Sequence, residues 1–251
     1  MKCKIFKDES QIAEFVGKRW IDYQKECTNR LFFVSSSLSK TIIPIYQWII
    51  ENADSFENWN NFRFVLMDEQ LEKNRGISYI SVNDSASYER FAREKFLNPL
   101  KNFLGNSKKI LLKPNLGYLK EFDGTIKKHS GIDLLILAIG AKGHYAQVIP
   151  KTPLKTGFHI TILTKEFIEN HTKKGGSYEG SKFRKFGMSL GPIQVLQSKK
   201  IFVIITGKSK KRIAKQLFSY NSFDPNFPIS IIFHPKIKNK TEVIISKDVI
   251  D

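Results

Sequence analysis

The sequence predicts an α/β fold, built as a single doubly wound, mostly parallel sheet with helices on both faces. Short runs at residues 31–34, 132–139 and 201–205 are almost entirely apolar. Such runs are typical of strands that are covered on both faces, as in a parallel sheet. Segments with helical spacing of apolar residues alternate with these runs along most of the chain, and this alternation favours the doubly wound arrangement.

The strands are predicted from apolar runs that end in turn-forming residues. In chain order we expect them at residues 31–34, 61–67, 109–113, 132–139, 158–163, 201–205, 229–233 and 243–245. Residues 115–130 are polar and are expected to be irregular. Residues 173–185 contain three glycines and are expected to form a mobile loop.

The helices are predicted from capping residues and from apolar spacing. The first follows Asp8, where apolar residues recur mainly at three- and four-residue intervals, and the second contains Ile45–Ile49. Ser87 and Thr164 can each cap the start of a later helix. A short helix is expected to begin within residues 187–192, where a proline suits the first turn, and another follows residue 207.

Length and composition predict one domain over residues 1–251. The chain is 41% apolar, which is enough for a substantial core, and no apolar stretch reaches the ~18 residues that a membrane span needs. Cys3 and Cys27 make neither a disulfide framework nor a zinc site. With no secretory-type segment at the N-terminus, we expect a cytoplasmic protein without a metal site.

The formal net charge of +17 favours anionic partners, from phosphate esters to nucleic acid. A plainer interpretation is that the lysines form a solvated surface. The sequence contains no helix-turn-helix, zinc finger or aromatic–basic stacking pattern, so it does not favour nucleic-acid binding.

The central apolar run, Ile132–Ile139, ends at Gly140, and Gly143 and His144 follow within four residues. Ligands of open α/β sheets bind beyond the carboxyl ends of the strands. A histidine that a glycine turn holds at this edge is a candidate acid or base. The alternative is a glycine-rich connection in which the histidine is incidental.

Two further segments are expected at the same edge of the sheet. Asp68 and Glu69 follow a buried strand, and the alternative is that they form a solvated acidic turn. Ser39, Lys40 and Thr41 lie between the first strand and the second helix, where backbone N–H groups can bind an anion. The alternative for that loop is simple helix capping by Ser39 or Thr41.

The order and spacing of six motifs resembles one family, that of glucosamine-6-phosphate deaminase and 6-phosphogluconolactonase. The motifs are Phe64–Glu69, Ser87-Tyr88, Asp133–His144, Gly187–Gly191, Thr206–Lys210 and Pro228–His234. The deaminase branch of the family is favoured modestly by the first two motifs. The spacing from His144 to Thr164, and on to Ser189, favours the same branch.

The resemblance implies a role for each candidate residue. It also implies that the protein needs no cofactor. Asp68 is the expected base for the C2 proton of the sugar. His144 is expected to handle ring opening in a deaminase or to activate water in a lactonase. The remaining expected contacts to the sugar phosphate are Ser39, Lys40, Thr41, Gly140, Gly143, Lys173 and Lys210.

The chain departs from the family beside the histidine. Relatives carry Asp-Gly-His where this chain has Lys142-Gly143-His144, and deaminases carry a glutamate where it has Ile149. Lys173 falls near the place of a phosphate-binding arginine. If Lys142 faces the site, it disfavours the protonated form of His144 or binds an acidic substrate. Otherwise it points to solvent and activity is lost.

Three hypotheses about function follow. The first is a deaminase and isomerase that releases ammonia from an amino-sugar 6-phosphate. The second is a hydrolase of a sugar lactone phosphate, and the third is a non-catalytic protein that binds a sugar phosphate. The sequence leaves the oligomeric state open, a homo-oligomer included.

Overall fold

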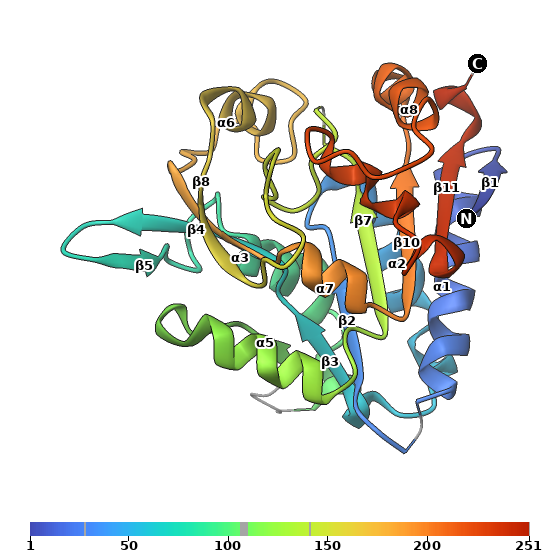
Figure 1. The fold of residues 1–251 in the computed structure, drawn as a ribbon. Helices are drawn as coiled ribbons and strands as arrows, with labels where there is room; N and C mark the ends of the chain where they lie inside the picture. Colours follow the sequence, from blue (N-terminus) through green and yellow to red (C-terminus); the bar gives the residue numbers. More distant parts are fainter. Residues whose placement is uncertain (28, 106–109, 141, 251) are drawn as a thin grey trace.

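The main sheet is parallel and places the ends of its central strands at one edge of the molecule (Figure 1). The computed structural model describes residues 1–27, 29–105, 110–140 and 142–250. Within them the strand order is β1-β11-β10-β7-β2-β3-β6, and all six pairings are parallel. The bounds are β1 Lys2–Phe6, β2 Phe32–Ser36, β3 Phe62–Val65, β6 Leu111–Leu112, β7 Leu134–Ala138, β10 Lys200–Ile205 and β11 Thr241–Ser246.

Helices cover both faces of this sheet, as predicted. On one face pack α1 (Glu9–Lys25), α2 (Ile43–Glu51) and α3 (Tyr88–Ala92), which continues as a π-helical turn over Arg93–Leu97. On the other pack α5 (Leu119–Lys128), α7 (Pro192–Gln197) and α8 (Lys211–Phe218). β2 and four of the five residues of β7 are buried, which explains why Phe32–Val34 and β7 are apolar without alternation.

A second, antiparallel sheet was not predicted and corrects the expectation of a single sheet. Its order is β5-β4-β9-β8, and it lies to the left in Figure 1. The bounds are β4 Asp68–Lys73, β5 Ile77–Tyr79, β8 His159–Ile162 and β9 Phe186–Ser189. The chain passes from the main sheet to the second between Val65 and Asp68. The alternation of residues 158–163 indicated a strand with one exposed face, which suits an antiparallel sheet.

Two local predictions are wrong, and several strands were missed. Pro228–Phe233 forms a buried 3-10 helix rather than a strand, because a short apolar run also fits a buried helical turn. Residues 119–128 are helical although only Ile126 of that helix is buried, so the apolar stripe was too narrow to detect. The strand at residues 186–189 was not predicted, although the short helix expected to begin within 187–192 does begin there, at Pro192. The exposed edge strand β1 was missed altogether.

Other predictions of elements are confirmed. Asp8, Ser87 and Thr164 each accept a backbone hydrogen bond at the start of a helix. The last of these caps α6 (Lys165–Thr172), and a short α4 (Lys101–Leu104) precedes the undescribed residues 106–109. Lys109, at the start of the strand expected at 109–113, lies outside the described residues. No helix in the described part of the chain is long and apolar enough to cross a membrane. The single-domain assignment stays a prediction.

Candidate active site

A cavity of about 650 Å³ lies beyond the carboxyl ends of β2, β7 and β10. Its walls come from the loops that follow these strands, from the start of β4, from α3 and from the segment after α6. Eight of the ten predicted site residues line it: Ser39, Lys40, Thr41, Asp68, Gly140, His144, Lys173 and Lys210. The prediction that ligand-binding groups meet at this edge therefore agrees with the geometry.

Two glycines hold His144 against the end of β7. The Gly140 N–H donates to the His144 carbonyl at 2.9 Å, and the Gly143 N–H donates to the Gly140 carbonyl at 3.0 Å. A Cβ on Gly140 would lie 2.0 Å from Nε2 of His144, so only glycine fits beneath the ring. Gly143 has a φ of +75°, which glycine adopts without strain.

His144 is a neutral imidazole at neutral pH. Burial, and then the charges of His171 and Lys210, lower its pKa to about 3. Lys142 is not among the causes of this shift. The direction of the shift agrees with the sequence-based expectation, but its main cause is burial rather than a lysine two residues earlier.

Asp68 is a buried carboxyl group in the wall of the cavity. It exposes 5% of its surface, so the alternative of a solvated acidic turn is wrong. Its Oδ1 has no hydrogen-bond partner among the described residues. Burial, and then the charge of Glu69, raise the pKa of Asp68 well above its usual range. Such a carboxyl group is a strong base once it is ionised.

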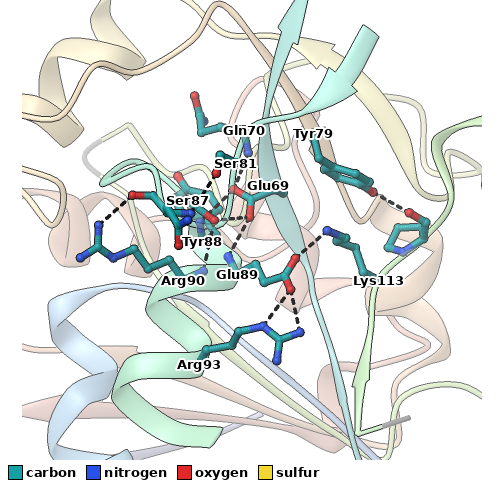
Figure 2. Close-up of polar contacts among 12 residues, drawn as sticks. Glu69, Gln70, Tyr79, Ser81, Ser87, Tyr88, Glu89, Arg90, Arg93 and Lys113 are labelled. Carbon is teal, nitrogen blue, oxygen red and sulfur yellow. Dashed lines mark hydrogen bonds and ion pairs between the residues drawn. The ribbon is translucent and has the colours of Figure 1, made fainter. Parts of the chain in front are cut away.

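Glu69 has a different task, since neighbouring residues of a strand point to opposite faces. Its carboxylate accepts hydrogen bonds from the Ser87 hydroxyl and from the backbone N–H groups of Gln70, Tyr88 and Glu89, at 2.7–2.9 Å (Figure 2). These contacts fix the start of α3 against β4. The helix start in turn places Tyr88 in the cavity wall.

The opposite wall is cationic. The ammonium group of Lys210 donates to the Ile139 carbonyl at 2.7 Å, which ties the turn after β10 to the end of β7. Burial lowers its pKa, and the nearby charge of Lys173 lowers it further. Lys173 itself donates to the Asn170 side chain at 2.8 Å. An anion between these lysines would relieve their repulsion.

In the loop after β2, the side chain of Ser39 does not cap the helix and is instead, among the described residues, an unpaired polar group at the cavity. Ser39 occupies the N-cap position of a 3-10 turn, yet its side chain makes no capping bond. Its buried hydroxyl oxygen has no partner among the described residues. The Lys40 N–H donates to the Ser177 hydroxyl at 3.2 Å, so the segment after α6 reaches this loop.

That segment, residues 173–185, is anchored although we expected a mobile loop. The buried Tyr178 donates its hydroxyl to the Leu38 carbonyl at 2.9 Å, and its ring packs on Tyr88. Arg184 forms an ion pair with Asp84 at 2.6 Å. The segment thus covers one side of the cavity.

Lys142 and Gly143 are the two predicted residues outside the cavity lining. Lys142 lies in a second cavity of about 420 Å³ and pairs with Glu166 at 3.0 Å, with both side chains 58% exposed. Gly143 is buried, and a Cβ there would meet the Phe227 ring. Ile149, at the place of the expected carboxylate, lines the second cavity, to which His144 also belongs.

Among the lining residues that were missed, three carry side chains suited to substrate contact: Tyr88, His171 and Arg212. Tyr88 follows a helix cap that the sequence did indicate. His171 was expected within a helix, but helical spacing does not say which residues face a ligand. Arg212 lies two residues after Lys210 and lines both cavities, and the structure gives it no ion pair with a described residue.

Comparison with known proteins decides the family. A family model described as glucosamine-6-phosphate isomerases/6-phosphogluconolactonase matches residues 7–243. The chain belongs to this family. The glucosamine-6-phosphate deaminase of Clostridium beijerinckii is 29% identical over 227 residues, which is 88% of each chain.

Solved structures of the family share the fold. A monomeric glucosamine-6-phosphate deaminase superposes with a TM-score of 0.82 at 19% identity, over 99% of this chain and 98% of that one. The 6-phosphogluconolactonase of Leishmania guyanensis gives 0.72 at 14% identity, over 99% and 97%. The mostly parallel α/β fold predicted from the sequence is therefore that of the family.

Proposed function

We propose that this protein converts glucosamine 6-phosphate, or a close amino-sugar 6-phosphate, to a ketose phosphate with release of ammonia. The observation that carries the proposal is Asp68, a buried and unpaired carboxyl group that shares one cavity with His144 and Lys210. The similarity to relatives named as deaminases supports the same assignment.

The chemistry requires the sugar ring to open and a proton to move from C2 to C1. Lys210 holds the phosphate, with Lys40, Lys173 and Arg212 as further cations at the same cavity. His144 assists ring opening. Ionised Asp68 removes the C2 proton and returns it to C1, and a second proton passes from the amine to O1, so that the C1 aldehyde becomes an alcohol and the amine becomes an imine at C2. Water adds to that carbon, and ammonia leaves as the ketone forms.

A lactonase is the second candidate, and the neutral state of His144 favours it. With a pKa of about 3, the imidazole is available as a base at neutral pH. It could activate water for attack on a lactone carbonyl. That reaction gives Asp68 no proton to remove. A non-catalytic sugar-phosphate protein is the third candidate, motivated by Lys142 and Ile149.

Paired assays distinguish the three candidates. Wild-type protein is incubated with glucosamine 6-phosphate while ammonia and ketose phosphate are measured, and separately with 6-phosphogluconolactone. Ammonia and ketose in equal amounts support the proposal, and lactone hydrolysis alone supports the second candidate. Thermal stabilisation by sugar phosphates without turnover supports the third. Cytoplasmic location and oligomeric state stay open predictions.

Replacing Lys210 by Met is expected to raise KM for the sugar phosphate by about 30-fold or more, with a smaller effect on kcat. The reason is that a charged contact to a bound phosphate, partly withdrawn from water, contributes about 2 kcal/mol or more. Steady-state kinetics measure the effect. Lys211→Met is the matched control, because Lys211 is exposed and absent from the cavity lining. Equal KM values for the two variants would remove Lys210 from the phosphate site.

Replacing Lys142 by Ala is expected to change kcat/KM by less than about threefold. Its ion pair with Glu166 is exposed, and exposed pairs contribute about 0–1 kcal/mol. The pH profile of the variant, measured beside wild type, checks this expectation. A loss of more than tenfold would restore Lys142 to the catalytic role that the sequence predicted.

A further inference from the structure

The chain lacks the two carboxylates that the family resemblance leads us to expect near His144. Lys142 and Ile149 stand in their places, and both lie in the second cavity. Ring opening nevertheless requires two groups. One takes the proton from the hydroxyl on C1, and the other donates a hydrogen bond to the ring oxygen, where negative charge develops as the C1–O5 bond breaks. A neutral His144 alone does not perform both tasks efficiently.

A second imidazole lies where the missing group is needed. His171, in the last turn of α6, lines the main cavity, and its ring centroid is 5.6 Å from that of His144. Both rings pack on Phe167, with centroid distances of 4.6 Å for His144 and 4.2 Å for His171. At this separation one sugar hydroxyl can contact both imidazoles.

The structure also fixes the tautomer of His171. Its Nδ1 lies 2.8 Å from the Phe167 carbonyl, which can only accept, so Nδ1 carries the proton. Nε2 is then a lone-pair nitrogen, and it makes no hydrogen bond with any described residue. Packing of the ring against Phe183, at 5.5 Å, holds this orientation.

We propose that His171 is a second catalytic histidine, which takes the C1 hydroxyl proton while the neutral His144 donates a hydrogen bond to the ring oxygen. This inference rests on the proposed function. As Nε2 of His171 accepts the proton, the C1–O5 bond breaks and C1 becomes an aldehyde. The N–H of His144 donates to O5. The imidazolium of His171 then gives its proton to O5, so the net change is transfer of one proton from O1 to O5, and both imidazoles end neutral.

The charges around the pair are consistent with a single shared proton. A charge on His171 disfavours a charge on His144, and Lys210 disfavours a charge on either ring. Further cations in the lining of the cavity are Lys40, Lys173, Lys174 and Arg212. Asp68 is a buried acid in the same lining. Protonation of one imidazole therefore keeps the other neutral and ready to accept or donate.

His171→Asn tests the proposal because it keeps the hydrogen bond made by one ring nitrogen and removes the other nitrogen. The Asn amide can still donate to the Phe167 carbonyl, whereas nothing replaces Nε2. For glucosamine 6-phosphate we expect kcat to fall by about 10²-fold, the usual size of one acid–base contribution. An analogue methylated on the 5-hydroxyl cannot close the pyranose ring and therefore needs no ring opening. For this analogue we expect kcat of His171→Asn to differ from wild type by less than threefold. Added imidazole should partly restore activity to His171→Ala.

His159→Asn is the matched control. Nδ1 of His159 likewise lies 3.0 Å from a backbone carbonyl, that of Gly157, and the residue does not line the main cavity. Two results would overturn this inference while leaving the proposed function in place, provided that wild-type protein is active. One is an equal loss of kcat by His171→Asn on both substrates. The other is a His171→Asn protein with full wild-type activity. Wild-type protein that releases ammonia from neither substrate would overturn the proposed function and this inference with it.

Discussion

Replacing Asp68 by Asn is expected to lower kcat for ammonia release by about 10²- to 10⁴-fold, the range that a general base contributes. The amide has nearly the same shape but cannot take the C2 proton. Because Asp68 is buried and its Oδ1 is unpaired, removing its charge should leave the thermal stability equal or higher. Steady-state ammonia release and a thermal unfolding curve measure the two effects.

The control for this variant is the exposed Asp54→Asn, which lies away from the cavity. It should match wild type in both measurements. An Asp68→Asn protein that keeps its ammonia release within threefold of wild type would show that Asp68 is not the base. If the protein instead hydrolyses the lactone and Asp68→Asn does so equally well, the lactonase hypothesis gains support.

The pH dependence of ammonia release should reflect the raised pKa of Asp68. Only the ionised carboxylate removes a proton, so kcat/KM rises with pH as Asp68 ionises. Since burial and Glu69 raise its pKa well above the usual range, this rise is expected at a higher pH than for an exposed aspartate. A pH–rate profile checks it. A profile already flat from pH 5 upward would contradict the raised pKa.

Replacing Glu69 by Ala is expected to reduce the free energy of unfolding by at least about 3 kcal/mol. The change leaves the backbone N–H groups of Gln70, Tyr88 and Glu89 without their buried acceptor, and each such group costs about 1–3 kcal/mol. It also frees the start of α3 from β4 (Figure 2). Chemical denaturation measures the loss.

Glu94→Ala is the matched control, because Glu94 is exposed and, among the described residues, forms its one ion pair with Arg90, four residues earlier. It should cost less than about 0.5 kcal/mol. The loss in free energy of unfolding for Glu69→Gln should lie between those of the two alanine variants, because the glutamine amide keeps one acceptor oxygen. Equal stability of Glu69→Ala and Glu94→Ala would contradict the structural role of Glu69.

The main sheet and most of the cavity could be predicted because their signals are local. The apolar run before Gly140 identified a buried strand, and the edge of a parallel sheet then placed Asp68, Lys210 and His144 together. The second sheet could not be predicted in the same way. The strand that begins at Asp68 opens with three polar residues that are all buried, and only their tertiary partners explain this.

The functional meaning of two residues depended on orientation, which the sequence does not contain. Lys142 was expected to act on His144, yet its side chain reaches Glu166 in the second cavity. His171 was an unremarked helical residue, yet the last turn of α6 brings it beside His144.

The most direct test of the central claim follows the hydrogen on C2 of the substrate. Glucosamine 6-phosphate deuterated at C2 is incubated with wild-type protein, and the label is followed by NMR while ammonia is measured. We expect the deuterium to leave C2, for C1 or for solvent, in step with ammonia release, and to remain in place with Asp68→Asn. Deuterium that stays on C2 in the presence of stoichiometric wild-type protein would contradict the account.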